Sequence, residues 1–125
     1  MKKTLIVISA VTVLTGAGFA ADAWTAPARA AAKKNAIPSD PVSIGRGKTV
    51  YAGECASCHG SSGRGDGPAA KDLEKHPGDM TKLGGQSDGA LFWKITEGKK
   101  PMASFATKLS EQQRWDVINY MKTLK

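Results

Sequence analysis

The sequence predicts a small all-α domain in which short helices are joined by glycine-rich loops. Apolar residues recur at helical spacing towards the C-terminus, behind a capping box formed by Ser110 and Gln113. The chain has 14 glycines among 125 residues, and several of them cluster in runs that favour loops. We find no β-strand run and no internal repeat, so about three to five short helices are expected to make up the fold.

The first helix of the domain is expected to begin with Ser43 as its N-cap and to run to about residue 56. Gly45, Gly47 and Gly53 make this helix intrinsically weak. A glycine at a helix crossing lets two backbones approach closely, and such a crossing would compensate for the weakness. We therefore expect this helix to pack against another one.

A loop and two further helices are expected to follow. Residues 59–67 contain glycine at nearly every second position and should form a loop, with a brief helical turn over residues 69–75. Ser87 opens a helix that stops near Gly98. The last helix follows the capping box, and its apolar surface comprises Trp115, Val117, Ile118, Tyr120, Met121 and Leu124.

The N-terminus has the layout of a secretory signal peptide. Two lysines precede an apolar run over residues 5–19, and small residues follow near Ala20. We therefore expect residues 1–20 to be a signal peptide that is cleaved after Ala20. The apolar run is shorter than the roughly 20 residues of a membrane span, and an uncleaved anchor is the alternative.

The remaining chain is expected to consist of an arm and one domain. Residues 21–41 are rich in alanine, proline and lysine, which predicts a flexible arm that contributes little to the chemistry. Residues 42–125 are then the folded domain. A domain this small usually needs an additional link or a bound group to complete its core.

Cys55-Ala56-Ser57-Cys58-His59 is the most informative segment of the chain. Two thiols separated by two residues and followed by a histidine form the attachment motif of haem c. Each thiol can bond to one vinyl group of the porphyrin, and a helical turn through both can place the imidazole of His59 beneath the iron. The motif occurs once, so we predict one haem c per chain, covalently held by Cys55 and Cys58, with His59 as an axial ligand.

Three other functions of the two cysteines have weaker support. A thioredoxin-like redox pair belongs in a βαβ unit, which this sequence lacks. A zinc site needs four ligands, and Cys58 and His59 are chain neighbours that are hard to direct at one tetrahedral ion. A structural disulfide between Cys55 and Cys58 is chemically possible in an oxidising compartment.

The second axial ligand is expected to be a methionine, whose soft thioether favours ferrous iron. Met102 is the strongest candidate, because it lies in a proline-containing loop where an apolar side chain would otherwise be exposed. Met80, His76 and an open site are the alternatives. Met121 lies on the apolar surface of the last helix, where it is expected to fill the core.

Residues 45–124 resemble the class I c-type cytochromes, and most closely the bacterial monohaem members. Gly47 and Tyr51 match the family's N-terminal helix, and Val117 and Tyr120 match the C-terminal helix that crosses it. The resemblance implies a small cytochrome c fold, in which short helices wrap around one haem and the N- and C-terminal helices cross.

Two loops carry the rest of the resemblance. Gly67-Pro68 is similar to the family's Gly-Pro turn, which implies that the Pro68 carbonyl accepts a hydrogen bond from the second ring nitrogen of His59. Residues 98–105 are similar to the family's methionine loop. The commoner order in that loop places the proline after the methionine, whereas here a proline precedes Met102.

These features predict a periplasmic monohaem cytochrome c that transfers single electrons and is not an enzyme. The formal net charge of +7 includes Lys2 and Lys3 of the predicted signal peptide, and the remaining charge of +5 favours a redox partner with an acidic surface. The lysines are scattered rather than clustered with aromatic residues, which argues against nucleic-acid binding, and no stable membrane insertion is expected. A basic collar for the partner is expected at Lys82, Lys94, Lys99 and Lys100, with an ordinary solvated surface as the alternative.

Two other functions stay open at this point. The chain could be the haem subunit of a periplasmic dehydrogenase or oxidase rather than a monomer, which keeps the chemistry and changes the partner. A peroxidase-like enzyme would need an open sixth position and distal acid–base groups, and His76 is the only histidine left to supply one. Trp93 could either donate to a haem propionate or pack on the porphyrin.

Overall fold

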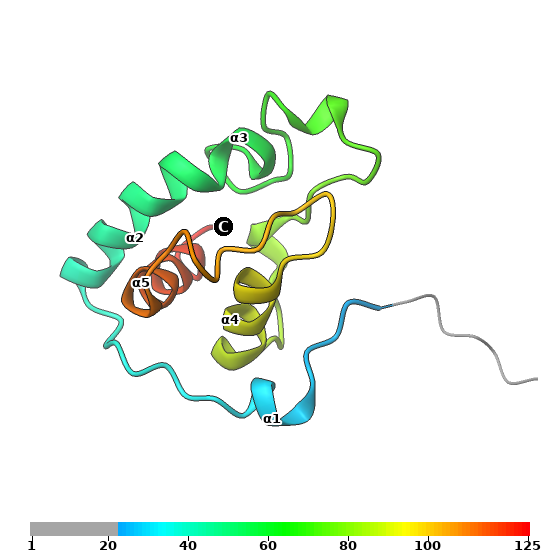
Figure 1. Cartoon of the computed structure of the whole chain (residues 1–125). Helices are drawn as coiled ribbons and strands as arrows, with labels where there is room; N and C mark the ends of the chain where they lie inside the picture. The colour runs from blue at the N-terminus through cyan, green and yellow to red at the C-terminus, as the bar shows by residue number, and fades with distance from the viewer. Residues whose placement is uncertain (1–22) are drawn as a thin grey trace, which may run out of the picture.

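The computed structural model describes residues 23–125; the predicted signal peptide of residues 1–20 lies outside the described residues. The helices of the described part are α1 (Ala28–Ala31), α2 (Pro41–Glu54), α3 (Ala56–His59), α4 (Asp88–Glu97) and α5 (Glu111–Met121), with 3₁₀ turns η1 (Ala70–Asp72) and η2 (Met80–Lys82). Residues 23–125 contain no β-strand, only an isolated bridge between Lys99 and Met102. The predicted all-α class is confirmed (Figure 1). No helix of this part of the chain is long and apolar enough to cross a membrane.

Helix α2 begins three residues earlier than the sequence suggests, and Ser43 is not its N-cap. The cap is Asp40, whose Oδ1 accepts a hydrogen bond of 2.8 Å from the backbone N–H of Ser43. Pro41 takes the first helical position, where its missing N–H costs nothing. The Ser43 hydroxyl is thereby free to point into the protein instead of capping the helix.

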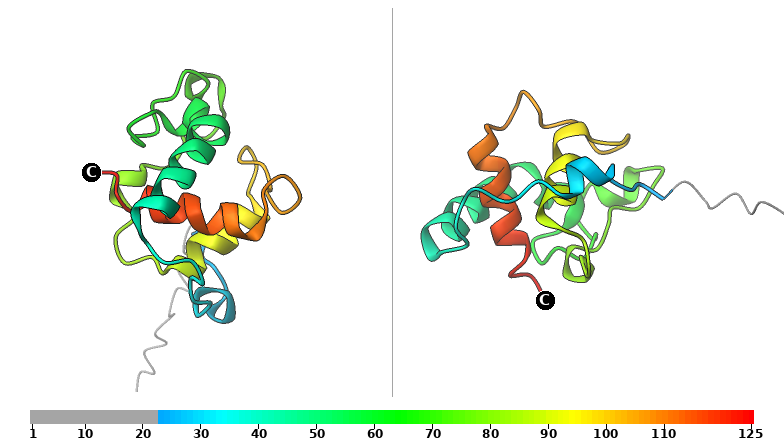
Figure 2. Two further views of the ribbon diagram at one scale, coloured as in Figure 1. Left: turned by 90° about the vertical axis from the view of Figure 1, so that its left-hand side faces the viewer. Right: turned by 90° about the horizontal axis from the view of Figure 1, so that it is seen from below.

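Helices α2 and α5 cross at Gly47, as the resemblance implies. A Cβ atom at Gly47 would lie 2.0 Å from the backbone oxygen of Asp116 and 2.9 Å from Cβ of Tyr120. Next to the crossing, the rings of Tyr51 and Tyr120 pack with their centroids 5.2 Å apart. The predicted crossing of the N- and C-terminal helices is confirmed; Figure 1 shows α5 beside α2, and the left view of Figure 2 shows the two helices crossing.

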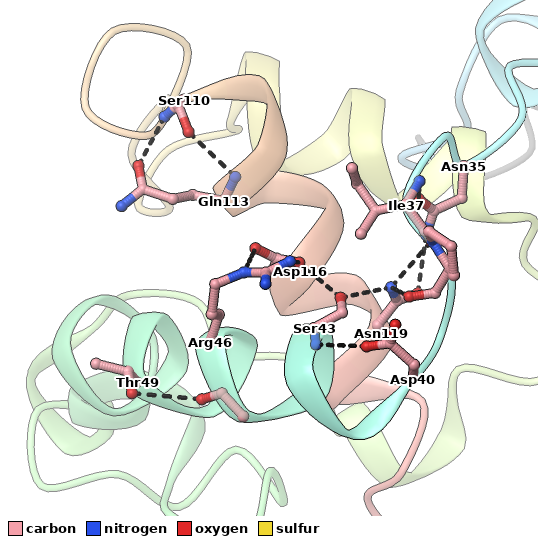
Figure 3. Close-up of polar contacts among 12 residues, drawn as sticks. Asn35, Ile37, Asp40, Ser43, Arg46, Thr49, Ser110, Gln113, Asp116 and Asn119 are labelled. Carbon is pink, nitrogen blue, oxygen red and sulfur yellow. Dashed lines mark hydrogen bonds and ion pairs between the residues drawn. The ribbon is translucent and has the colours of Figure 1, made fainter.

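A buried polar cluster fastens the crossing (Figure 3). Ser43 Oγ donates to Asp116 Oδ1 over 2.6 Å, and the guanidinium of Arg46 donates to both carboxylate oxygens of Asp116 over 2.8 Å. Asn119 Nδ2 donates in turn to Ser43 Oγ over 2.8 Å. Burial alone would raise the pKa of Asp116, but the hydrogen bonds from Arg46 and Ser43 outweigh it and hold that pKa below its ordinary value.

Helices α4 and α5 form the rest of the core, and both begin as predicted. Ser87 caps α4 by accepting from the backbone N–H of Ala90, and α5 has the complete Ser110–Gln113 capping box. The rings of Phe92 and Trp115 stack with their centroids 4.0 Å apart. The apolar surface predicted for the last helix is largely buried; its buried members are Trp115, Val117, Ile118 and Met121.

Residues 23–40, which we call the strap, fall within the predicted arm of residues 21–41 and make specific contacts with the helices. Short helix α1 packs on α4, and the strap then continues across α5 to the start of α2 (Figure 2). Ala26 is buried, and Asn35 donates to Asn119 Oδ1 over 2.9 Å. A few small and polar residues with specific partners thus connect this alanine-rich segment to the helices.

Candidate functional site

Helix α3 arranges the Cys-x-x-Cys-His motif as a single helical turn. The backbone N–H groups of Cys58 and His59 both donate to the carbonyl of Cys55, over 3.2 and 2.9 Å. Both cysteines are free thiols and half-buried, so the structure does not contain the disulfide that the sequence left possible. Burial raises the pKa of the Cys55 thiol to about 12, with smaller contributions from the charges of Glu54 and Cys58.

The glycine-rich loop after the motif folds back onto it. The backbone N–H groups of Gly65 and Gly67 donate to the carbonyls of His59 and Cys58, over 2.8 and 3.1 Å. A Cβ atom at Gly67 would lie 2.3 Å from the backbone oxygen of Ser57, so only glycine permits this approach. The loop therefore holds the motif rigidly at the surface of the core.

A cavity of about 490 Å³ opens beside α3, within the size range of cofactor sites. It brings together the predicted haem-binding residues Cys55, Cys58, His59 and Met102, which come from distant parts of the sequence. Its apolar wall comprises Leu73, Leu83, Leu91, Ile95, Phe105 and Met121. Two thiols, an imidazole, a thioether and an apolar wall match the chemistry of a covalently attached porphyrin.

Met102 reaches the cavity from a closed turn. The backbone groups of Lys99 and Met102 exchange two hydrogen bonds of 3.1 and 2.9 Å across the turn, which contains the cis peptide before Pro101. Gly98, at φ +67°, ends α4, and a Cβ there would lie 2.6 Å from the backbone of Ala103. The loop is thus folded back on itself, with the Met102 side chain half-buried against the core.

The alternative ligands lie in the same cavity. Met80 and His76 both line it, and Met80 is anchored by a backbone hydrogen bond of 2.6 Å to the Gly63 carbonyl. Met121 also lines the cavity, but it belongs to the buried surface of α5, as expected for a core residue. The geometry therefore keeps Met80 and His76 as alternatives to Met102.

The hydrogen bond expected between His59 and Pro68 is not the one that the structure has. His59 Nδ1 lies 2.9 Å from the carbonyl oxygen of Gly78. Pro68 is exposed, in a turn that lies against the backbone of Ser57 through Gly67 and Ala69. The segment that carries Gly78 thus passes beside the imidazole of His59.

Trp24 was missed by the sequence analysis. It belongs to the strap and lines the cavity, whereas Trp93, for which a haem contact was considered, does not. Lys94 lines the cavity too, and its Nζ lies 5.5 Å from the centroid of the Trp24 ring. No local pattern around Trp24 signals this position, because it depends on how the strap docks.

Comparison with known proteins identifies the family of this chain. The sequence model of the family described as Cytochrome c matches residues 44–125. The chain belongs to the cytochrome c family. Cytochrome c6 from Nostoc sp. is 32% identical over 109 residues, which cover 87% of this chain and 86% of the relative. Cytochrome c6 from Parathermosynechococcus lividus is 32% identical over 78 residues, 62% of this chain and 86% of the relative.

Comparison with a solved structure also supports the cytochrome c fold of this chain. A chain of the Kuenenia stuttgartiensis reducing HAO-like protein complex superposes with a TM-score of 0.65 and 36% identity. The match covers 70% of this chain and 46% of that chain, so this protein spans about half of that larger subunit. The predicted class I c-type cytochrome, with its small cytochrome c fold, is confirmed.

Family and motif together define the cofactor and the coarse function. A cytochrome c with the Cys55–Cys58 spacing carries covalently bound haem c, and the cavity beside α3 fits that group. The single motif makes this cytochrome c a monohaem electron carrier.

The rim of the haem cavity in this cytochrome c is basic. We use the word rim for the four lysines that line the cavity, Lys75, Lys94, Lys99 and Lys100. The acidic side chains in the lining are Glu54 and Asp79. Burial lowers the pKa of Lys94. Lys82, which the sequence analysis placed in the collar, does not line the cavity and pairs with Asp79 over 3.6 Å.

Proposed function

We propose that this chain is a periplasmic electron carrier whose haem iron is held by His59 and Met102. The observation that carries the proposal is the cavity in which the α3 turn meets the methionine loop of residues 98–105. Haem c supplies a one-electron ferric–ferrous couple when bound. Export through the predicted signal peptide supports a periplasmic location, because bacterial haem c is attached outside the cytoplasm.

His59 and Met102 suit electron transfer because each contributes a strong axial bond. A six-coordinate low-spin iron changes little in geometry on reduction, so the surrounding protein does not have to reorganise. The neutral thioether favours ferrous iron and raises the reduction potential above that of a bis-imidazole site. Met102 is preferred to Met80 because the loop of residues 98–105 folds back to direct it at the cavity, while Met80 belongs to turn η2.

Met102→Ala should remove the sulfur-to-iron charge-transfer band of the oxidised protein and lower its reduction potential. The potential should fall by about 100 mV or more, within the roughly 0.8 V range that axial ligands can set. Optical spectra and a redox titration measure both effects. Met80→Ala is the matched control and should keep the band; loss of the band in Met80→Ala alone would assign the ligand to Met80 instead.

The redox partner is proposed to present an acidic surface to the basic rim. Three of the lysines that line the cavity, Lys94, Lys99 and Lys100, belong to the predicted collar. An acidic partner would be attracted to this rim, and the encounter would weaken as salt screens the charges.

Replacing Lys99 and Lys100 together with glutamine should slow electron transfer to an acidic partner roughly threefold at low ionic strength and flatten the salt dependence. Stopped-flow rates over a series of salt concentrations measure both quantities. The matched control is Lys48→Gln with Lys125→Gln, which removes two charges that do not line the cavity. Equal effects of both double variants would show that net charge matters and the rim does not.

A second candidate function is a haem domain within a larger redox assembly. It is favoured by the match to a chain of the reducing HAO-like complex at 36% identity, where the similar region is 46% of that chain. Size-exclusion chromatography of the exported protein from its native source distinguishes the two. Elution as a free single chain, smaller than the 13.1 kDa of the full sequence by its signal peptide, supports the diffusible carrier. Co-elution with a larger redox protein supports the subunit.

A further inference from the structure

The strap is attached to α4 through close backbone contacts. A Cβ atom at Gly89, in the first turn of α4, would lie 2.4 Å from the backbone oxygen of Ala30 and 2.5 Å from that of Lys33. Ser87 Oγ donates to the Ala31 carbonyl over 2.6 Å. Gly89 is buried by these contacts, so α1 lies directly on the start of α4.

Side chains fix the strap to α5 as well. Lys33 forms a salt bridge of 2.8 Å with Glu111, and its Nζ lies 4.2 Å from the centroid of the Phe92 ring. Further along, Asn119 Nδ2 donates to the backbone carbonyls of Ile37 and Pro38, both over 3.2 Å (Figure 3). The strap is therefore held at several points along its length.

These attachments determine where Trp24 lies. The indole is half-buried and lines the same cavity as Cys55, His59 and Met102, at the N-terminal end of the strap. Nζ of Lys94 lies 5.5 Å from its ring centroid, within the range of a cation–π contact. The buried Ala26 anchors the chain two residues away. A large aromatic side chain is thus presented to a cofactor cavity by a segment that precedes the matched family region.

We propose that Trp24 is a haem-contacting residue, placed by the strap so that its indole covers part of the cavity and excludes water from the haem. The proposal rests on the haem cavity of the proposed function and adds a residue to it. Ferric haem carries one more positive charge than ferrous haem, and water stabilises the larger charge better. Excluding water therefore raises the reduction potential, which is one of the ways a protein tunes a haem.

The test is the reduction potential of the holoprotein with Trp24→Ala. Opening the cavity to water should lower the equilibrium constant for reduction about threefold, which is about 28 mV at 59 mV per tenfold for a one-electron couple. Trp24→Phe keeps an aromatic cover and should recover most of the potential. Trp93→Ala, which removes a half-buried indole outside the cavity, is the matched control and should leave the potential unchanged.

A second variant displaces the strap without touching the cavity. Gly89→Val would force α1 away from α4, and Gly89 is not part of the cavity lining. The reduction potential of Gly89→Val should be lower than that of the unmodified protein, as for Trp24→Ala, because the indole moves away from the cavity with the strap. An unchanged potential in Trp24→Ala, with the haem covalently attached and the sulfur-to-iron band intact, would overturn the role of Trp24 while leaving the proposed function standing. Loss of that band in the unmodified protein would instead count against the proposed ligands.

Discussion

Gly47→Ala is expected to lower the free energy of unfolding of the holoprotein by roughly 2–3 kcal/mol. The added Cβ would lie 2.0 Å from the backbone oxygen of Asp116, and a backbone atom cannot rotate away as a side chain can. Helix α5 would have to move off α2, which loosens the contact between the rings of Tyr51 and Tyr120. Urea unfolding followed by circular dichroism measures the loss.

Gly45→Ala is a control in the same helix with the opposite expected sign. A Cβ atom at Gly45 has nothing within 4 Å, so this substitution should only improve the helix, by about 0.5–1 kcal/mol. Both variants replace a glycine of helix α2 by alanine. They differ in that the new Cβ meets the backbone of α5 at position 47 and open space at position 45. Equal stabilities of Gly47→Ala and Gly45→Ala would mean that the helices do not cross as closely as the structure has them.

The features that could be predicted from sequence depend on short, local patterns. The Cys55–His59 spacing predicts a helical turn, and the Ser110–Gln113 box predicts the start of α5, because neighbouring residues alone determine both. The crossing at Gly47 was predicted from the family resemblance and is confirmed. A glycine is needed there because a Cβ atom would collide with the backbone of Asp116. Such patterns predicted most of the helices. They also pointed to Cys55, Cys58, His59 and Met102, which line the cavity.

The features that were missed depend on contacts between distant segments. The contacts of the strap could not be predicted, because its partners Gly89 and Asn119 lie far along the chain. The contact between His59 Nδ1 and the carbonyl of Gly78 also had no sequence signature, because any residue can supply a backbone carbonyl. Backbone groups and docked arms leave no local pattern, so only the folded arrangement shows them.

Ser43 illustrates how one local error hides a longer-range contact. The sequence assigned its hydroxyl to a helix cap, which is the usual function of a serine near a helix start. Asp40 is the cap, and the Ser43 hydroxyl instead donates to Asp116. Asp116 lies between apolar residues of α5, where a carboxylate would be placed on the solvent side by pattern alone. The buried polar cluster therefore emerges only when both helices are in place.

Asp116→Asn is expected to destabilise the holoprotein by about 2–3 kcal/mol at pH 7. The carboxylate is 1% exposed and accepts hydrogen bonds from Ser43 and from both sides of the Arg46 guanidinium. An amide can accept at only one of its two positions, and its NH₂ group would face a donor. The loss stays below that of a fully buried ion pair because the Arg46 side chain is 44% exposed and can turn to water.

The same variant should change how stability depends on pH. Because the pKa of Asp116 is held below its ordinary 3.8 in the folded protein, its contribution is complete above that value and is lost as the pH falls through the lowered folded pKa. The unfolding free energy of the unmodified protein should therefore fall more steeply below about pH 5 than that of Asp116→Asn. Asp79 and Glu111 also have lowered pKa values, but they are present in both proteins, so the difference between the two curves reports Asp116.

Glu111→Gln is the matched control for the loss of a carboxylate on α5. It breaks the salt bridge with Lys33, in which both side chains are about half exposed, so stability at pH 7 should change little. Urea unfolding of all three proteins between pH 3 and pH 7 makes the comparison. Parallel curves for Asp116→Asn and the unmodified protein would show that the Asp116 carboxylate does not gain its charge-dependent stability from the cluster, and that Ser43 and Arg46 hold the helix crossing by shape alone.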